Sequence, residues 1–209
     1  MSSITRKPAA VRREEIVQAV LHIIGEHGLT SLTTSNLAAE VGLTTGALFR
    51  HFASQEEILR EVTRHAVARI EATFPDESLA PLERLLALAR NRVRVLGADA
   101  GLAWFLRSEQ AALALPEDAA LLLRDLVTRS KNYLLMTLRE GVADGSIRGD
   151  IDPEVLLVPV LGTVHTLIGM SGVPQASSGR RPGVERVLEG LTCLLAPPQS
   201  KIKPKPSRR

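Results

Sequence analysis

The chain has 209 residues, of which 44% are hydrophobic and 3% aromatic, and its formal net charge at pH 7 is +3. This length suits one or two domains, and this apolar content can bury a sizeable core. The single cysteine, Cys193, excludes a disulfide framework within one chain and a cysteine-based zinc site, as expected of a protein in a reducing cytoplasm.

Targeting and membrane signals are not expected in this sequence. The N-terminal residues are basic, but no apolar run follows them that could form the core of a signal peptide. The most apolar stretch, residues 151–173, contains two acids, two prolines and a histidine, which favour a buried helix over a membrane span. A cytoplasmic location without membrane association is therefore predicted.

Charge is distributed unevenly along the chain. Residues 1–13 hold Arg6, Lys7, Arg12 and Arg13 without an acid, and residues 201–209 hold five bases without an acid. Between these ends, 17 basic residues face 23 acidic ones, so the body of the chain is acidic. The N-terminal segment could reach DNA phosphates or a minor groove, whereas residues 198–209 are predicted to be a disordered basic tail.

The first predicted helix has apolar residues at the 3.6-residue period from Ile16 to Ile24 and is closed by Gly28. Residues 33–52 then predict two short helices joined by a tight turn. Thr33 and Thr44 are suited to cap the two helices, and Gly42 lies where a positive φ is needed. Such a helix-turn-helix places its second helix in a DNA major groove, although a plain helical hairpin would have the same pattern.

The rest of the sequence predicts helices almost without interruption. Ser54 and Glu57 form a capping box for a fourth helix that runs toward Phe74. Further helices are expected over residues 81–96, around Trp104, over residues 116–144, from Pro153 and over residues 183–195. Residues 97–101 are expected to separate the first two of these helices, and residues 173–182 are expected to form a loop. No segment alternates with period two for long enough to need a strand, so the fold class is all-α with about nine helices.

The residues of the second and third helices, with those that follow, resemble the N-terminal domain of the TetR family of bacterial transcriptional regulators. The resemblance covers roughly residues 10 to 65 and rests on a set of matched positions: Gly28-Leu29, Thr33, Leu37-Ala38, Gly42, Thr44, Gly46, Leu48-Phe49, His51-Phe52 and Ser54–Leu59. Two positions depart from the family, which usually has Tyr at Phe49 and Lys at Gln55, so two phosphate contacts are missing.

The resemblance implies a domain organisation and a mechanism. Residues 1–56 would form the DNA-binding domain with its basic arm, and residues 57–197 a helical domain for effector binding and dimerisation. The protein would be a homodimeric, ligand-responsive regulator, most simply a repressor that a small molecule releases from a palindromic operator on double-stranded DNA. Effector binding would tilt the fourth helix and change the spacing of the two recognition helices.

DNA contacts are predicted from the matched positions. Thr33, Thr34, Thr44 and His51 would meet phosphates, and Phe49 would stack on the sugar–phosphate wall. Thr45, Gly46 and Ala47 would face the bases, since a glycine allows close approach and an alanine suits a thymine methyl. The complete predicted set is Thr33, Thr34, Thr44, Thr45, Gly46, Ala47, Phe49, Arg50 and His51.

The last two helices are more apolar than a single covering layer needs, which favours an isologous four-helix dimer interface over two helices central to a monomer. The residues predicted for this interface are Leu157, Leu161, Val164, Ile168, Val187, Leu191 and Leu194. An effector pocket is predicted among the fifth to eighth helices, lined by Trp104, Phe105, Tyr133, Met136 and His165. Few aromatic residues are available, so an aliphatic or acyl effector is favoured over a flat aromatic cation.

Catalysis is not expected. The five histidines show no HxxxH or HExxH spacing, and no GxSxG, P-loop or dinucleotide-binding glycine motif is present. Asp144, Asp150, Asp152 and Glu154 gather near one predicted turn, where acids are ordinary, so neither a metal nor a cofactor is predicted. A third interpretation stays open: a dimeric DNA-binding protein whose output is a protein partner, without a small effector.

Overall fold

The computed structural model describes residues 8–170 and 183–198, in which all regular structure is helical. The predicted all-α class is confirmed. The expected loop over residues 173–182, the two N-terminal cations Arg6 and Lys7, and residues 199–209 of the expected tail lie outside the described residues.

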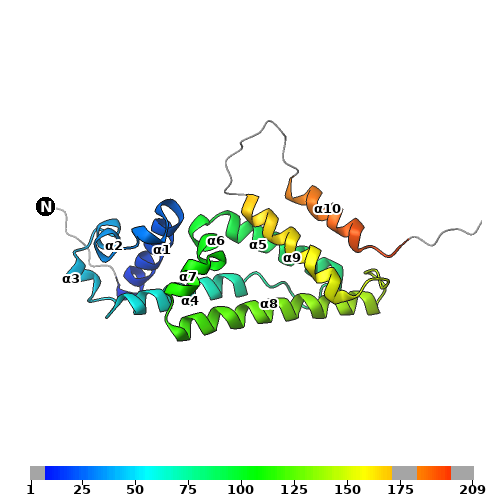
Figure 1. The fold of residues 1–209 in the computed structure, drawn as a ribbon, viewed down its shortest axis with the longest axis horizontal. Helices are drawn as coiled ribbons and strands as arrows, with labels where there is room; N and C mark the ends of the chain where they lie inside the picture. The colour runs from blue at the N-terminus through cyan, green and yellow to red at the C-terminus, as the bar shows by residue number, and fades with distance from the viewer. Residues whose placement is uncertain (1–7, 171–182, 199–209) are drawn as a thin grey trace, which may run out of the picture.

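Figure 1 shows the N-terminal helices gathered at one end of an elongated molecule. They are α1 (Ala9–His27), the short 3₁₀ helix η1 (Leu29–Ser31), α2 (Thr34–Glu40) and α3 (Thr45–Leu48). The helix α4 (Gln55–Glu71) leads from this group into the rest of the chain. The expected cap of α4 is present, because the Ser54 hydroxyl accepts from the Glu57 amide at 3.2 Å. The Glu57 carboxylate in turn accepts from the amide of Ala53, one residue before the cap, at 2.7 Å.

The second group of helices surrounds a core built from distant parts of the chain. It contains α5 (Pro81–Gly97), α6 (Ala100–Arg107), α7 (Glu109–Ala114), α8 (Glu117–Ala143), α9 (Pro153–Met170) and α10 (Val184–Leu195). The 27-residue α8 runs along one side of the molecule, α5 and α9 pack on it, and α10 lies outermost against α9 and α5. The predicted boundary between residues 56 and 57 falls inside the first turn of α4, so this helix joins the two groups.

Three details differ from the sequence-based prediction. The described residues hold ten α-helices, because α7 was not predicted; Ser108 caps it by accepting from the Ala111 amide at 3.2 Å. The sixth helix begins at Ala100, since Asp99 accepts from the Leu102 amide at 2.8 Å, and Gly101 therefore lies inside it. The recognition helix α3 ends at Leu48, because the chain tightens there and His51 donates to the Leu48 carbonyl.

Gly101 brings the two groups of helices into backbone contact. A Cβ placed on Gly101 would lie 1.8 Å from the Leu21 carbonyl oxygen of α1, and a Cβ on Gly25 would lie 2.8 Å from the Gly101 nitrogen. The two backbones can approach this closely because Gly25 and Gly101 have no side chains. We call this contact the α1–α6 joint, defined by Leu21, Gly25 and Gly101.

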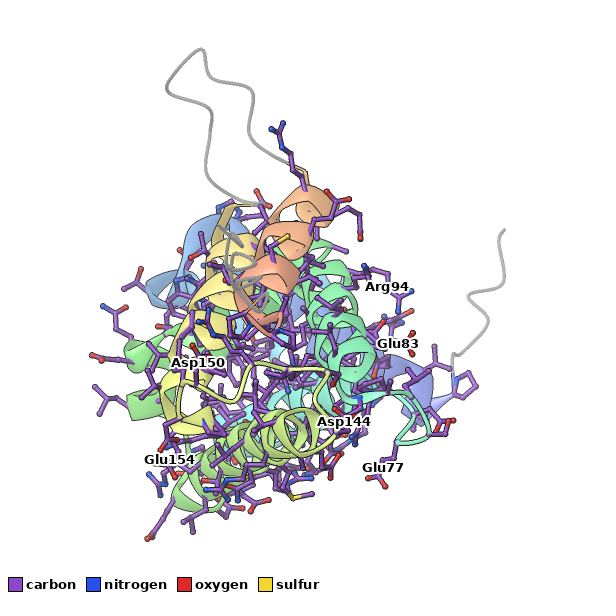
Figure 2. The ribbon with its side chains drawn as sticks, turned by 90° about the vertical axis from the view of Figure 1, so that its right-hand side faces the viewer. Glu77, Glu83, Arg94, Asp144, Asp150 and Glu154 are labelled. Atoms are coloured by element: carbon purple, nitrogen blue, oxygen red, sulfur yellow. The ribbon has the colours of Figure 1, made fainter. Side chains whose placement is uncertain are left out.

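The end of the molecule remote from α3 is rich in acids. Figure 2 looks onto that end, where Glu77, Glu83, Asp144, Asp150 and Glu154 are labelled. Arg94 is labelled there as well, and the Asp150 and Glu154 carboxylates pair with Arg148 and Arg139.

No helix among the described residues is both long and apolar enough to cross a membrane.

Candidate nucleic-acid interface and effector cavity

The helix-turn-helix has the local geometry that its sequence predicts. The Thr33 hydroxyl caps α2 by accepting from the Asn36 amide at 3.1 Å, and the Thr44 hydroxyl caps α3 by accepting from the Ala47 amide at 3.2 Å. Gly42 turns the chain between them with φ +65°, a conformation that side chains disfavour. Both helices therefore begin at fixed residues in a fixed relative orientation.

A small core holds α2 and α3 against α1 and α4. Leu37 and Ala38 of α2, Leu48 of α3 and Phe52 after it are all buried. The opposite side of α3 stays open, with Thr44, Thr45, Gly46, Phe49 and Arg50 exposed and Ala47 half-buried. The predicted DNA-contacting residues thus lie on one accessible surface, and Thr33 on α2 is exposed beside them while Thr34 and His51 are half-buried.

Gly46 is not required by the packing of the protein itself. A Cβ built on it meets nothing within 4 Å, and its φ is not positive. The absence of a side chain at this position therefore serves no internal contact. Arg50 is likewise open, since it has no ion-pair partner within residues 8–170 and 183–198.

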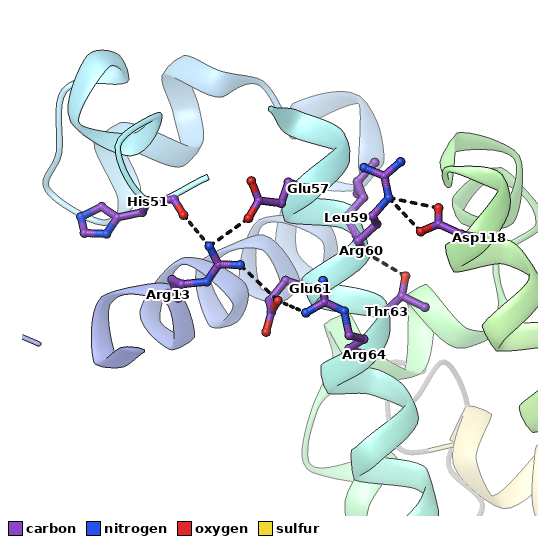
Figure 3. A network of polar contacts seen from close by, with 9 residues as sticks. All are labelled: Arg13, His51, Glu57, Leu59, Arg60, Glu61, Thr63, Arg64 and Asp118. Carbon is purple, nitrogen blue, oxygen red and sulfur yellow. Dashed lines mark hydrogen bonds and ion pairs between the residues drawn. The ribbon is translucent and has the colours of Figure 1, made fainter. Parts of the chain in front are cut away.

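A polar network fixes the far side of this domain, as Figure 3 shows. The Arg13 guanidinium donates to the His51 carbonyl at 2.5 Å and to Glu57 at 3.0 Å, and it contacts Glu61 at 3.2 Å. It also lies 4.0 Å from the centre of the Phe52 ring. The backbone amide of Ala53 and the Arg13 guanidinium together lower the pKa of Glu57. The end of α3 is thus tied to α1 and α4.

This network corrects the expected role of two arm cations. Arg13 is held by α4, and Arg12 donates to the Val41 carbonyl at 3.3 Å and pairs with Glu15 at 2.9 Å. Both are residues of α1, not of a free arm. The sequence could not reveal their partners on other helices, because these lie 29 to 48 residues away.

The second domain contains a cavity of about 720 Å³ where the ends of α5, α6 and α9 meet the start of α7. Its apolar lining includes Leu96, Ala100, Ala103, Trp104 and Ile168. Its polar lining is Arg107, Ser108, Glu109 and Gln110. Cavities of this size accommodate small organic ligands.

The structure does not bring the five predicted pocket residues together. Trp104 lines the cavity, whereas Phe105 is buried in the core. Tyr133 packs edge-on against Phe74 with ring centres 4.9 Å apart, and Met136 is 57% exposed on α8. His165 lies on the exposed flank of α9, one turn before Gly169 at the cavity wall. The prediction was wrong for α8, which contributes no residue to the cavity lining, because helical periodicity does not show which helices surround a cavity.

The seven predicted dimer residues divide between two environments. Leu157, Val164, Ile168 and Leu191 are buried within one chain, and Leu161 and Val187 are partly buried. Leu194 alone among the seven is strongly exposed, at 62%. Two apolar side chains of α9 that were not predicted, Val155 and Val158, are exposed as well.

The acids near residue 150 have ordinary structural roles. Asp150 pairs with Arg148 at 2.8 Å, and the Asp144 and Asp152 carboxylates accept from the amides two residues later. Within the described parts of the chain, no group of three or more His, Cys, Asp or Glu side chains could hold a metal ion.

This architecture defines a class: a helix-turn-helix protein with an open recognition helix and a larger helical domain that contains a cavity. Residues 16–62 match the family of bacterial regulatory proteins described as the tetR family. This segment therefore has the N-terminal domain of the TetR family, whose members are transcription regulators that bind DNA.

Individual relatives agree with this assignment. Over 168 residues the chain is 29% identical to the HTH-type transcriptional repressor KstR2 of Mycolicibacterium smegmatis, which covers 75% of this chain and 77% of that protein. It is 28% identical over 159 residues to the nucleoid occlusion factor SlmA of Vibrio vulnificus, which covers 74% and 80% of the two chains. The crystal structure of AibR with isovaleryl coenzyme A and operator DNA has the same fold, with a TM-score of 0.71 at 20% identity over 90% of this chain and 99% of that one.

Proposed function

We propose that the protein is a homodimeric repressor that binds a pseudo-palindromic operator through α3 and leaves it when a small molecule enters the α5–α6–α7–α9 cavity. The observation that carries this proposal is the α1–α6 joint. One wall of the cavity is α6, and the same helix touches the backbone of α1. A ligand and an operator would thus act on a single connected set of helices.

The joint allows little independent movement of the two helices. Because the Leu21 carbonyl lies against the Gly101 backbone, no flexible side chain can absorb a displacement of α6. A ligand that binds better to a shifted α6 would favour the α1 position that goes with it. Operator affinity then changes through a difference in the stability of two states, and the coupling is reciprocal.

The comparisons support both halves of this proposal. KstR2 is named a transcriptional repressor, and AibR was crystallised with an acyl-coenzyme A and operator DNA. An aliphatic or acyl effector is consistent with the cavity, whose apolar lining has one aromatic ring, Trp104.

The test begins with in vitro selection of DNA by the purified dimer. We expect the selected sites to contain two half-sites related by a two-fold axis. Gel shifts on that operator with short- and medium-chain acyl-coenzyme A thioesters and free acids would then identify releasing ligands. Selection of asymmetric or unrelated sequences would contradict the proposed pseudo-palindromic operator. If no candidate ligand weakens operator binding, the proposed ligand gating is contradicted.

The dimer would use the outer sides of α9 and α10. Val155 and Val158 on α9 and Leu194 on α10 are exposed apolar side chains on the two helices that the family resemblance implicates. Val158→Asp or Leu194→Asp should produce monomers in light scattering after gel filtration, while Val127→Asp on the exposed side of α8 should not. If all three variants have the mass of the dimer, Val158 and Leu194 do not form the dimer interface.

A second candidate function has one observation in its favour. Leu113 of α7 is 86% exposed, and Leu121 and Val127 on the adjacent α8 are also exposed. Such a surface could contact a protein partner, and SlmA, a relative of this chain, is named a nucleoid occlusion factor and not a repressor. Loss of in vivo regulation in Leu121→Asp, with operator affinity and ligand release intact in vitro, would favour this alternative.

A further inference from the structure

The cavity region holds positive charge that the protein does not neutralise. Arg107, at the end of α6, lines the cavity and has no ion pair within the described residues. A Cβ built on Gly169 would lie 3.2 Å from the Arg107 guanidinium, so this group rests on the α9 backbone at the cavity wall. A side chain at position 169 would displace it.

Arg92 adds a second, less accessible cation one turn before the cavity residue Leu96 on α5. Its guanidinium donates to the Ser130 hydroxyl at 2.8 Å and to the Thr73 hydroxyl at 3.4 Å, and lies 5.3 Å from the centre of the Phe74 ring. Every one of these partners is neutral. Burial lowers the pKa of Arg92 to about 10, so the group stays charged at neutral pH.

A half-buried cation without an anion is unusual in this chain. The nearly buried Arg84 pairs with Glu140, and even the exposed Arg90 pairs with Glu185 at 2.7 Å. A guanidinium removed from water loses hydration that neutral hydroxyls replace only in part. Arg92 does not line the cavity, so its charge would attract a bound anion through space and not by a direct hydrogen bond.

The positive charges of Arg107 and Arg92 both act on the side chain of His165. It lies one turn before Gly169 on α9, and its pKa is lowered by burial and by the charges of Arg107 and Arg92. The imidazole is therefore neutral at pH 7 and adds no further charge. The single acid that lines the cavity, Glu109, lies in the first turn of α7 and is exposed, at the mouth with Gln110.

We propose that the effector is an anionic amphiphile, whose carboxylate or phosphate binds Arg107 at the cavity wall and whose apolar chain lies along Ala100, Ala103 and Trp104 of α6, with the charge of Arg92 adding to the attraction. The inference rests on the proposed ligand-gated function and names the chemical class of its ligand. The two small alanines leave space for a chain beside Trp104, and Leu96 and Ile168 complete the apolar wall.

The test uses four probes with the same ten-carbon chain: decanoate, decyl phosphate, decanol and decylamine. Trp104 is the single tryptophan of the chain and lines the cavity, so its fluorescence reports binding directly. We expect decanoate or decyl phosphate to bind about tenfold or more tightly than decanol, because an ionic hydrogen bond adds to the same apolar contact. The two anions distinguish a carboxylate site from a phosphate site. Decylamine should bind weakest.

Matched arginine variants test the position of the anion. Arg107→Gln should abolish the preference for the anion over decanol, because Arg107 lines the cavity, and Arg92→Gln should reduce it. Arg94→Gln should keep it, because Arg94 is an exposed residue on the same helix α5 as Arg92. Since Arg92→Gln could also disturb folding, a second measurement uses the unaltered protein. Bound decanoate should raise the pKa of His165 in an NMR titration, because it offsets the nearby positive charges.

The outcomes separate this inference from the proposed function. Equal affinity for decanoate and decanol, tighter binding of decylamine, or no binding by any probe would overturn the anionic site. Release of operator DNA by decanol but not by either anion would overturn it and leave ligand gating standing. An anion that binds, shifts His165 and leaves operator affinity unchanged would support the site and contradict gating.

Discussion

The helix-turn-helix and the helical domain behind it are stabilised in different ways. In the first, α2, α3 and α4 each begin with a hydroxyl cap from the preceding residue, and the glycine turn fixes how α2 meets α3. In the second, the short helices α6 and α7 have side-chain caps too, but α5, α8 and α10 begin without one and are held by burial of long apolar faces against one another.

This difference has a functional consequence. The exposed positions of α3 are not used by the protein's own packing, so they are available to DNA and can change without loss of the fold. The second domain has no comparable division, because its cavity lies among the same helices that form its core. A substitution there is expected to alter stability together with the proposed ligand binding. The α1–α6 joint is the backbone contact between the helix-turn-helix group and the helical domain.

The largest effect is expected at that joint. In Gly101→Ala the new Cβ would overlap the Leu21 carbonyl, and a backbone atom cannot rotate away. We expect a loss of about 3 kcal/mol in the free energy of unfolding, measured by urea denaturation, and a change in ligand-induced DNA release. The matched control is Gly46→Ala, which meets no neighbour and should leave unfolding almost unchanged. Similar stability of the two variants would show that α1 and α6 are not in contact.

The second prediction sharpens the contrast at α3. Gly46→Leu should weaken operator binding by about 1–3 kcal/mol or more, because the side chain would hold the helix away from the base edges. Its unfolding curve and dimer mass should match those of the unaltered protein, since the site is open. Full operator affinity in this variant would mean that α3 does not enter the groove at Gly46.

A third prediction uses the unequal charge of the chain. Deletion of residues 2–9 removes Arg6 and Lys7 and spares Arg12 and Arg13, which the structure ties to other parts of the protein. The slope of log affinity against log salt should become shallower by up to about 4 per dimer, with operator preference unchanged. If the salt slope is unchanged, the arm does not take part in DNA binding. If the operator preference changes, the arm enters a groove and contacts the bases.

The smallest effect is expected from the two departures from the family pattern. Gln55 is the first residue of α4 and is exposed, so Gln55→Lys can add a phosphate contact at a small cost from the helix dipole. Binding should tighten and its salt slope should steepen by about one unit per chain. Phe49→Tyr should add about 1 kcal/mol of affinity if its hydroxyl meets a phosphate. If neither variant alters affinity or slope, these side chains do not face the DNA backbone.

The sequence by itself determined the all-α class, the resemblance of the N-terminal part to the TetR family and the local form of the helix-turn-helix. Thr33, Gly42 and Thr44 could be interpreted correctly because a cap or a positive φ depends on residues within one turn of the chain. The same reasoning found the starts of α4, α5 and α9 at Ser54, Pro81 and Pro153. Short-range geometry leaves little for tertiary contacts to change.

Only the tertiary structure decided which surfaces meet. Met136 and Leu157 both fit an apolar helical pattern, yet the first is exposed and the second is buried. Arg13 belonged to a basic segment in the sequence and lies in an ion-pair network with Glu57 and Glu61 in the fold. Gly101 was expected in a loop and instead brings α6 against α1. Such outcomes depend on partners tens of residues away, and neither periodicity nor local propensity contains that information.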